Sequence, residues 1–361
     1  MSTERRDVIP DKAASRQPSI ALVMIVRNEE KVLRRCLASA SPWVDEIIVV
    51  DTGSSDATGA IAAEMGAKIF SFPWIDDFAA ARNFAVAQSG CDWLLSLDAD
   101  EELIDGAQLR PLVSDLENKG HDAAALRMCD VDAKLNVYND YAVGRLWRTG
   151  RGIAFVGRVH EKLRLSAPPI LLPLRVRHYG YRDISRECEI AKSERNLRLL
   201  EMDLAERPGD LELAEHKLRC LEIIGRLEEA AEWAATLLTL HAIPKLGCSC
   251  SFSVLSVLEQ CGRLPVDLLE QALEAWPKDP DLCYLAAVVS LRLGRHDAAA
   301  QLLLLWLRLV LRLRQEAAAK RCLSLGRLGQ IAAALRQLAA APSRAHMLAE
   351  ADELLRRIGK E

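Results

Sequence analysis

Two carboxylates separated by a single residue follow a strongly apolar run in the first half of the chain. The run covers residues 93–97 and leads directly into Asp98-Ala99-Asp100. An apolar run of this length predicts a buried strand, and ligands of open α/β sheets bind where such strands end. Paired carboxylates there suit Mg²⁺ or Mn²⁺, which bind oxygen ligands together with the phosphates of a substrate. The alternative is that the acidic segment 98–102 only caps a following helix.

Short apolar runs alternate with helical patterns over the first hundred residues. We expect strands at 20–26, 46–50, 68–72 and 93–97 and helices at 29–40, 56–65 and 78–88. This alternation is typical of βαβ units, and the nearly continuous Val, Ile and Leu of the strands favours a parallel sheet covered on both faces. The predicted class of this part is therefore α/β, Rossmann-like, with a mostly parallel sheet.

The second half of the chain has a different period. Gly-Arg dipeptides begin at residues 225, 262, 294 and 326, so successive turns lie 37, 32 and 32 residues apart. Helix pairs repeating at this interval are typical of tetratricopeptide-type arrays, although an irregular helical bundle is an alternative. We divide the chain into a disordered leader at 1–18, an α/β domain at 19–185 and an all-α repeat domain at 186–361.

Composition narrows the classes of function. A formal net charge of −4 gives no reason to expect nucleic acid as a partner. None of the ten cysteines forms a Cys-x-x-Cys pair, and no secretory segment follows Met1, so we expect reduced thiols and a cytoplasmic location.

Arg308 and Arg312 interrupt the apolar run 302–313, which predicts no transmembrane span. It is either a buried repeat helix or an interfacial helix at the inner face of a membrane.

Six motifs occur in a familiar order over the first half of the chain. They are IVRNEE (25–30), VVDTGSSDAT (49–58), WIDDFAAARN (74–83), DWLLSLDADE (92–101), VHEKL (159–163) and HYGY (178–181). Together they resemble the family 2 glycosyltransferases, which have the GT-A fold, and more closely the subgroup with a tetratricopeptide tail. One departure is Thr52, which stands where many relatives have a second acid, so the nucleotide base stays open.

The resemblance implies an inverting, metal-dependent glycosyltransferase. It would move a sugar from a nucleoside-diphosphate sugar, with a UDP-sugar as first candidate, to a glycan or peptide acceptor. Asp100 is then the direct ligand of Mg²⁺ or Mn²⁺, while Asp98 holds the ribose or reaches the metal through water. His178 matches a late histidine that supplies another metal ligand in many GT-A enzymes, and a packed core histidine is the alternative.

The resemblance also implies a donor pocket and an acceptor side. Asn28 and Glu29 would line the base pocket, and Asp51 would meet the base or the ribose. Arg82 would contact the diphosphate or hold Asp98, unless it is a surface cation paired with Asp77.

Inversion needs a base on the face opposite the leaving group. Glu161 is the candidate, and His160 would orient it or be the base itself. A structural hydrogen-bonded pair is the alternative for both residues.

The second hypothesis is a peptide- or protein-binding scaffold whose degenerate transferase domain no longer turns over. The complete set of Asp98, Asp100, Glu161 and both histidines favours the enzyme. The open end of a repeat array also allows a homodimer.

Overall fold

The computed structural model describes residues 16–132, 134–180, 185–315, 328–339 and 344–358. The chain divides between Arg182 and Asp183 into two compact units. The first unit holds all the strands among the described residues, and the described part of the second is helical. Most of the predicted leader, residues 1–15, lies outside the described residues, as does the predicted turn at Gly326.

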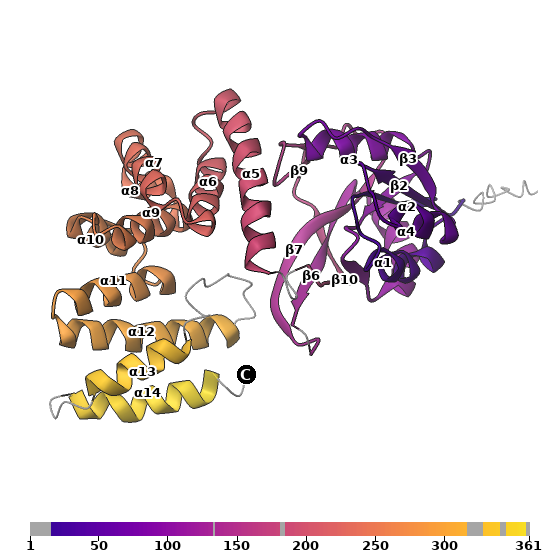
Figure 1. The fold of residues 1–361 in the computed structure, drawn as a ribbon. Coiled ribbons are helices and arrows are strands. Elements are labelled where there is room, and N and C mark those ends of the chain that lie inside the picture. The colour runs from indigo at the N-terminus through magenta and orange to yellow at the C-terminus, as the bar shows by residue number, and fades with distance from the viewer. Residues whose placement is uncertain (1–15, 133, 181–184, 316–327, 340–343, 359–361) are drawn as a thin grey trace, which may run out of the picture. The chain divides into compact units, whose positions relative to one another are not determined.

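The first unit is built on an eight-stranded sheet with the order β3-β2-β1-β4-β7-β6-β10-β5 (Figure 1). The strands of this sheet are β1 (Ile20–Val26), β2 (Glu46–Asp51), β3 (Lys68–Ser71), β4 (Trp93–Ser96), β5 (Glu101–Leu103), β6 (Ala123–Val131), β7 (Val137–Arg148) and β10 (Ile170–His178). Strands β1 to β4 pair in parallel, as do β6 and β10. Strand β7 pairs antiparallel to both β4 and β6, and β5 pairs antiparallel to β10. A separate antiparallel pair consists of β8 (Ala154–Val156) and β9 (Lys162–Arg164).

Helices cover both faces of this sheet, as the continuous apolar strands predict. They are α1 (Leu33–Ala40), α2 (Thr58–Glu64), α3 (Phe78–Ala87) and α4 (Leu109–Lys119), with short 3₁₀ segments η1 (Ser41–Trp43) and η2 (Gly106–Gln108). Alternate residues of β1 enter different cores, because side chains of a strand point to opposite faces in turn. Leu22 packs in the core that includes residues of α1 and α4, whereas Val23 packs in the core that includes residues of α3.

The segment after Asp98-Ala99-Asp100 does not begin a helix. Residues 101–103 form strand β5, and the next helical segment starts only at Gly106. The helix-capping alternative for the acidic segment is therefore wrong, because these residues pair with the end of β10 instead.

The second unit is a series of helices. They are α5 (Arg186–Glu206), α6 (Leu211–Ile224), α7 (Leu227–Leu240), α8 (Ile243–Leu246), α9 (Cys248–Gln260), α10 (Val266–Ala275), α11 (Pro280–Arg292), α12 (His296–Gln315), α13 (Leu328–Ala339) and α14 (Ala345–Ile358). Gly225, Gly262 and Gly294 have φ angles of 88°, 65° and 70°, which favour glycine and stop α6, α9 and α11. Each is followed closely by the next helix, as the repeat interval predicts.

The apolar run 302–313 lies in α12 and faces the interior of the second unit. Leu303, Trp306 and Leu307 are buried in a core that also includes residues of α13 and α14. Arg308 donates from Nε to Glu350 Oε1 at 2.6 Å. The run is therefore a buried helix of the array, the first of the two predicted alternatives. No helix in the described part of the chain is both long and apolar enough to span a membrane.

Replacing either of two glycines of the first unit by alanine should have opposite effects on the free energy of unfolding. A Cβ at Gly106 would lie 2.2 Å from Trp43 Cδ1, whereas a Cβ at Gly59 in α2 would meet nothing within 4 Å. We expect Gly106→Ala to lower the free energy of unfolding by about 1 to 3 kcal/mol through overpacking. Gly59→Ala should raise it by roughly 0.5 to 1 kcal/mol. The urea unfolding midpoints of the two full-length variants test this, and equal midpoints would contradict the packing of Trp43 over Gly106.

Candidate active site

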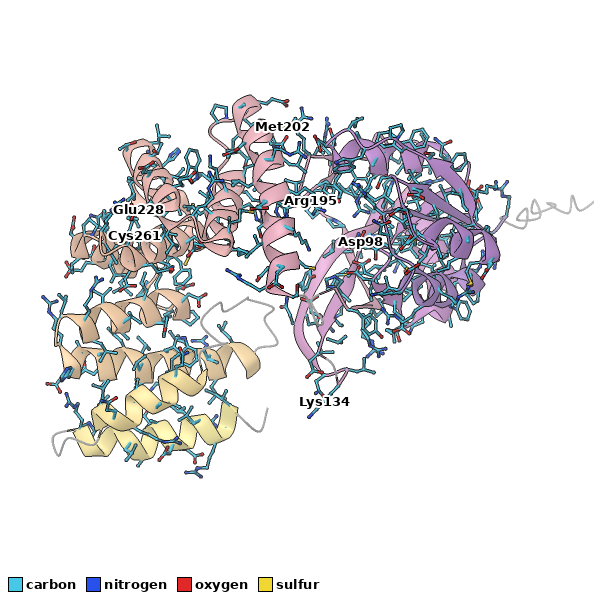
Figure 2. All side chains as sticks on the ribbon, in the orientation of Figure 1. Asp98, Lys134, Arg195, Met202, Glu228 and Cys261 are labelled. Carbon is cyan, nitrogen blue, oxygen red and sulfur yellow. The ribbon has the colours of Figure 1, made fainter. Side chains whose placement is uncertain are left out.

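The carboxyl ends of β1, β2, β4 and β10 reach one edge of the sheet. Strands β1, β2 and β4 are parallel neighbours, and β10 runs in the same direction as β4 because two antiparallel pairings separate them. Asn28 and Glu29 follow β1, Asp51 ends β2, and Asp98, labelled in Figure 2, follows β4. His178 is the last residue of β10. The topology thus gathers most of the predicted site residues at one edge.

The loops after β1 and β2 are tied together by polar contacts. Asp51 Oδ1 accepts hydrogen bonds from the backbone amides of Gly53 and Ser54, at 2.9 and 2.7 Å. Asn28 has a positive φ of 57°, and its Oδ1 accepts from the backbone amide of Ser55 at 2.8 Å. These contacts fix the loops in which the donor-binding residues were predicted.

Thr52, the departure from the family pattern, faces inward. Its side chain is buried, and its hydroxyl donates to the Val26 carbonyl at 3.1 Å. The hydroxyl therefore has an internal partner at a position where many relatives carry an acid. Burial, and then the charges of Asp100 and Asp98, raise the pKa of Glu29 to about 7.

Two arginines hold both carboxylate oxygens of Asp98. Arg82 Nη2 donates to Oδ1 at 2.6 Å, and Arg145 Nη2 donates to Oδ2 at 2.9 Å. Burial alone would raise the pKa of Asp98, but the charges of Arg145 and Arg82 outweigh it and hold that pKa well below its usual range. Arg145 also donates to Glu101, a carboxyl group whose pKa burial raises to about 7. Asp98, whose side chain is 34% exposed, is thus an anion neutralised by two protein cations.

Arg82 also reaches the predicted acceptor side. Its Nε donates to Glu161 Oε1 at 2.5 Å, so one side chain of α3 joins Glu161 to Asp98. The alternative pairing of Arg82 with Asp77 does not occur, because Asp77 caps α3 by accepting from the Ala80 amide at 2.8 Å. Arg82 is buried, which excludes the surface cation of that alternative.

The segment that carries Glu161 is anchored to α3. Asn83 donates from Nδ2 to the Phe155 carbonyl and accepts from the Phe155 amide, both at 2.9 Å. The Phe78 amide donates to the Arg158 carbonyl at 2.9 Å. His160 is exposed and has a φ of 52°, an unusual angle for a residue other than glycine.

Asp100 and His178 meet at the edge of the sheet. His178 Nε2 lies 3.4 Å from Asp100 Oδ2, and His178 Nδ1 lies 2.7 Å from Asp130 Oδ1. Burial would lower the pKa of His178, but its hydrogen bonds to Asp100 and Asp130 outweigh burial and raise the pKa to about 10. Asp130 also accepts from Asn139 Nδ2 at 2.8 Å, which orients its carboxylate. A cation bound between Asp100 and His178 would take the place of the proton on Nε2.

This pair fits a divalent cation in two respects. Ligands of one octahedral Mg²⁺ at about 2.1 Å lie about 3 Å apart, close to the Asp100–His178 separation. Asp130 holds Nδ1, which leaves Nε2 as the ligand nitrogen. Among the described residues no group of three His, Cys, Asp or Glu side chains is arranged for a metal. A cation here would need further oxygens from a substrate, as Mg²⁺ commonly does in phosphate sites.

Four contributors to the site were not predicted: Arg145, Asp130, Gly180 and the buried role of Glu101. Arg145 lies in a strand that had not been predicted, and Asp130 ends another. Gly180 is close to the metal pair, since a Cβ there would lie 2.1 Å from Asp100 Oδ2 and 2.5 Å from His178 Nε2. The HYGY motif, which contains Gly180, was the only sequence feature that pointed to this glycine.

The chain is similar in sequence to known proteins. Residues 21–156 match the family model described as Glycosyl transferase family 2. A TPR repeat-containing protein of Synechococcus elongatus is 39% identical over 229 residues, which are 59% of this chain and 55% of that protein. The SPbeta prophage-derived glycosyltransferase SunS of Bacillus subtilis is 28% identical over 232 residues, 60% of this chain and 52% of that protein. The chain thus spans about half the length of these relatives.

Solved structures include a glucosyl-3-phosphoglycerate synthase from Mycobacterium tuberculosis in complex with Mn²⁺, UDP and glucosyl-3-phosphoglycerate. The match is 26% identical, covers 31% of this chain and 44% of that chain, and has a TM-score of 0.26. The mostly parallel sheet of the first unit is of the GT-A type. The family match identifies this unit more closely as a family 2 glycosyltransferase domain, followed by a tetratricopeptide-like helical unit.

Gly180 provides a test of the metal pair. We expect Gly180→Ala to abolish Mn²⁺ binding, because the added Cβ would displace Asp100 Oδ2 and His178 Nε2. Gly90→Ala is the matched control, since a Cβ there would meet nothing within 4 Å. Calorimetric titration of Mn²⁺ into the full chain with UDP measures the effect. Equal Mn²⁺ affinity in Gly180→Ala and Gly90→Ala would show that Asp100 and His178 do not bind the ion.

Proposed function

We propose that the chain is an inverting, metal-dependent glycosyltransferase. Its donor is a nucleoside-diphosphate sugar, with a UDP-sugar as first candidate, and its acceptor is a glycan or a peptide. The observation that carries the proposal is the 3.4 Å approach of His178 Nε2 to Asp100 Oδ2, with Nδ1 held by Asp130. A structural histidine would not need a neighbouring carboxylate on each ring nitrogen at a sheet edge that gathers four loop residues.

Asp100 and His178 are the residues that would hold Mg²⁺ or Mn²⁺, with the donor diphosphate completing the ligand set. The bound ion supplies Lewis-acid stabilisation of the charge that develops on the departing diphosphate. Asp98 does not act as a direct ligand in this proposal, because Arg82 and Arg145 already occupy its two oxygens. Asp98 instead holds the two guanidinium groups beside the donor.

The loops after β1 and β2 bind the nucleoside. Asn28 and Glu29 line the base pocket, and Asp51 meets the base or the ribose. Support for this placement comes from the hydrogen bonds between the two loops, which shape one continuous wall. Since Thr52 is turned inward, Asp51 and main-chain groups recognise the base.

Glu161 is the proposed general base. It takes the proton from the acceptor hydroxyl or thiol as the acceptor atom bonds to the anomeric carbon, and the bond to the diphosphate breaks with its electron pair. Arg82 orients Glu161 through the 2.5 Å contact from its Nε to Oε1. His160, one residue earlier on a strained backbone, orients Glu161 or is itself the base.

The helical unit holds the acceptor in this proposal, because helix-pair arrays present extended surfaces for binding. A cytoplasmic location is supported by the free thiols of the nine cysteines within the described residues.

The metal role of Asp100 is tested by Asp100→Ala. We expect turnover to fall on the order of 10³, because losing a direct ligand removes ~4 kcal/mol of transition-state stabilisation. Asp115→Ala is the control, since Asp115 pairs with Lys119 on the exposed side of α4. The assay compares sugar transfer or donor hydrolysis with and without a chelator. An Asp100→Ala protein that retains most of its chelator-sensitive activity would contradict the metal role.

The base is tested by Glu161→Gln, in which the amide oxygen can still accept from Arg82. Donor and metal binding should be preserved, while transfer falls by ~10² to 10⁴ at pH 7. A thiol acceptor ionises near pH 8.5 and a sugar hydroxyl does not, so recovery of transfer between pH 7 and pH 9 indicates a thiol. A flat and deep loss indicates a hydroxyl. Loss of donor binding would instead place Glu161 in the donor site.

A further inference from the structure

Arg145 lies in the middle of the candidate site without belonging to any motif of the sequence. It is on β7, the long strand labelled in Figure 1. In the sheet order β7 lies between β4 and β6. Its Nη2 donates to Asp98 Oδ2 at 2.9 Å and also to Glu101 Oε1. Only 12% of the Arg145 side chain is exposed, so these contacts are shielded from solvent.

Asp98 and Glu101 are the two ends of the turn that carries Asp100. The Glu101 amide donates to the Asp98 carbonyl at 3.0 Å, and the Asp98 amide donates to Glu101 Oε2 at 2.9 Å. The turn is therefore closed by its own backbone and by the Glu101 carboxylate. Arg145 bonds to the side chains at both ends of this turn and so fixes it from the neighbouring strand.

The positive charge of Arg145 is needed to keep the 98–101 turn in this conformation. Without its guanidinium, the buried Glu101 carboxylate would lose its cation, and the Asp98 carboxylate, which is 34% exposed, would keep only Arg82. Removing one partner from a buried ion pair leaves an uncompensated charge that the surrounding structure must relieve. The turn between the two carboxylates is the segment that can move to do so.

We propose that Arg145 is a positioning residue that directs the Asp100 carboxylate toward His178 by holding both ends of the 98–101 turn. The proposal rests on the proposed function, because it assigns Asp100 to a divalent cation. Arg145 itself contacts neither Asp100 nor the cation in this arrangement. Both contacts come from the same nitrogen, Nη2, and the rigid guanidinium fixes where that nitrogen lies. A lysine cannot replace it, since its ammonium is a point charge on a flexible stem.

The test is a Mn²⁺ titration of the full chain with UDP present and no sugar donor, followed by the electron paramagnetic resonance signal of free Mn²⁺. Arg145→Met and Arg145→Lys should weaken Mn²⁺ binding about 10- to 100-fold, the range for residues that orient metal ligands. Arg148→Met is the matched control on the same strand, where Arg148 Nη2 pairs with Glu117 at 3.2 Å. It should leave Mn²⁺ affinity unchanged.

A rescue separates positioning from a merely structural role. Adding Glu101→Gln to Arg145→Met removes the uncompensated carboxylate and keeps an oxygen to accept from the Asp98 amide, so Mn²⁺ affinity should recover about tenfold. If Arg145→Met does not fold, Arg145→Lys decides the question, because it keeps the charge and loses the rigid guanidinium.

Two results would overturn the positioning role. One is wild-type Mn²⁺ affinity in a folded Arg145→Lys protein. The other is unchanged Mn²⁺ affinity together with weaker UDP binding, which would mean that Arg145 contacts the donor itself. A wild-type chain that binds UDP but no Mn²⁺ would contradict the proposed function, and the positioning role with it.

Discussion

The ion pairs around Asp98 are the interaction on which the candidate site depends. Arg82 and Arg145 come from α3 and β7, and each donates to one oxygen of the same carboxylate. Through these contacts Asp98 joins the Glu161 segment on one side to the Glu101 turn on the other. A buried guanidinium is costly unless a carboxylate compensates its charge, and a buried carboxylate is costly without such a cation. The proposed general base Glu161 and the proposed metal ligand Asp100 are therefore positioned by one network.

The sheet topology explains why this network can form. Strand β7 enters between β4 and β6 with the opposite direction, and this brings Arg145 beside the turn that follows β4. Strand β10 runs in the same direction as β4. His178, its last residue, therefore lies at the same end of the sheet as Asp100. Asp130, at the end of β6, is the register neighbour of His178 and holds its second nitrogen. The approach of His178 to Asp100 thus depends on three strand pairings.

The sequence could predict the first four strands and the acids at their ends, because parallel strands are continuous apolar runs and motifs mark where they stop. It could not predict Arg145, whose partner Glu101 lies 44 residues away, or Asp130, which lies 48 residues from His178. These contacts depend on an antiparallel insertion that leaves no periodic signal. Helix α1 begins at Leu33 rather than at residue 29, because Asn28 and Glu29 are engaged with the loop after β2.

The central claim is that this chain uses a divalent cation at Asp100 and His178 to activate a nucleoside-diphosphate sugar. The most direct measurement is the release of nucleoside diphosphate from a panel of nucleotide sugars by the full chain, which needs no knowledge of the acceptor. The account predicts slow hydrolysis of at least one donor with Mn²⁺ or Mg²⁺, and none after a chelator is added. Release that persists with the chelator, or no release from any donor with either metal, would contradict it.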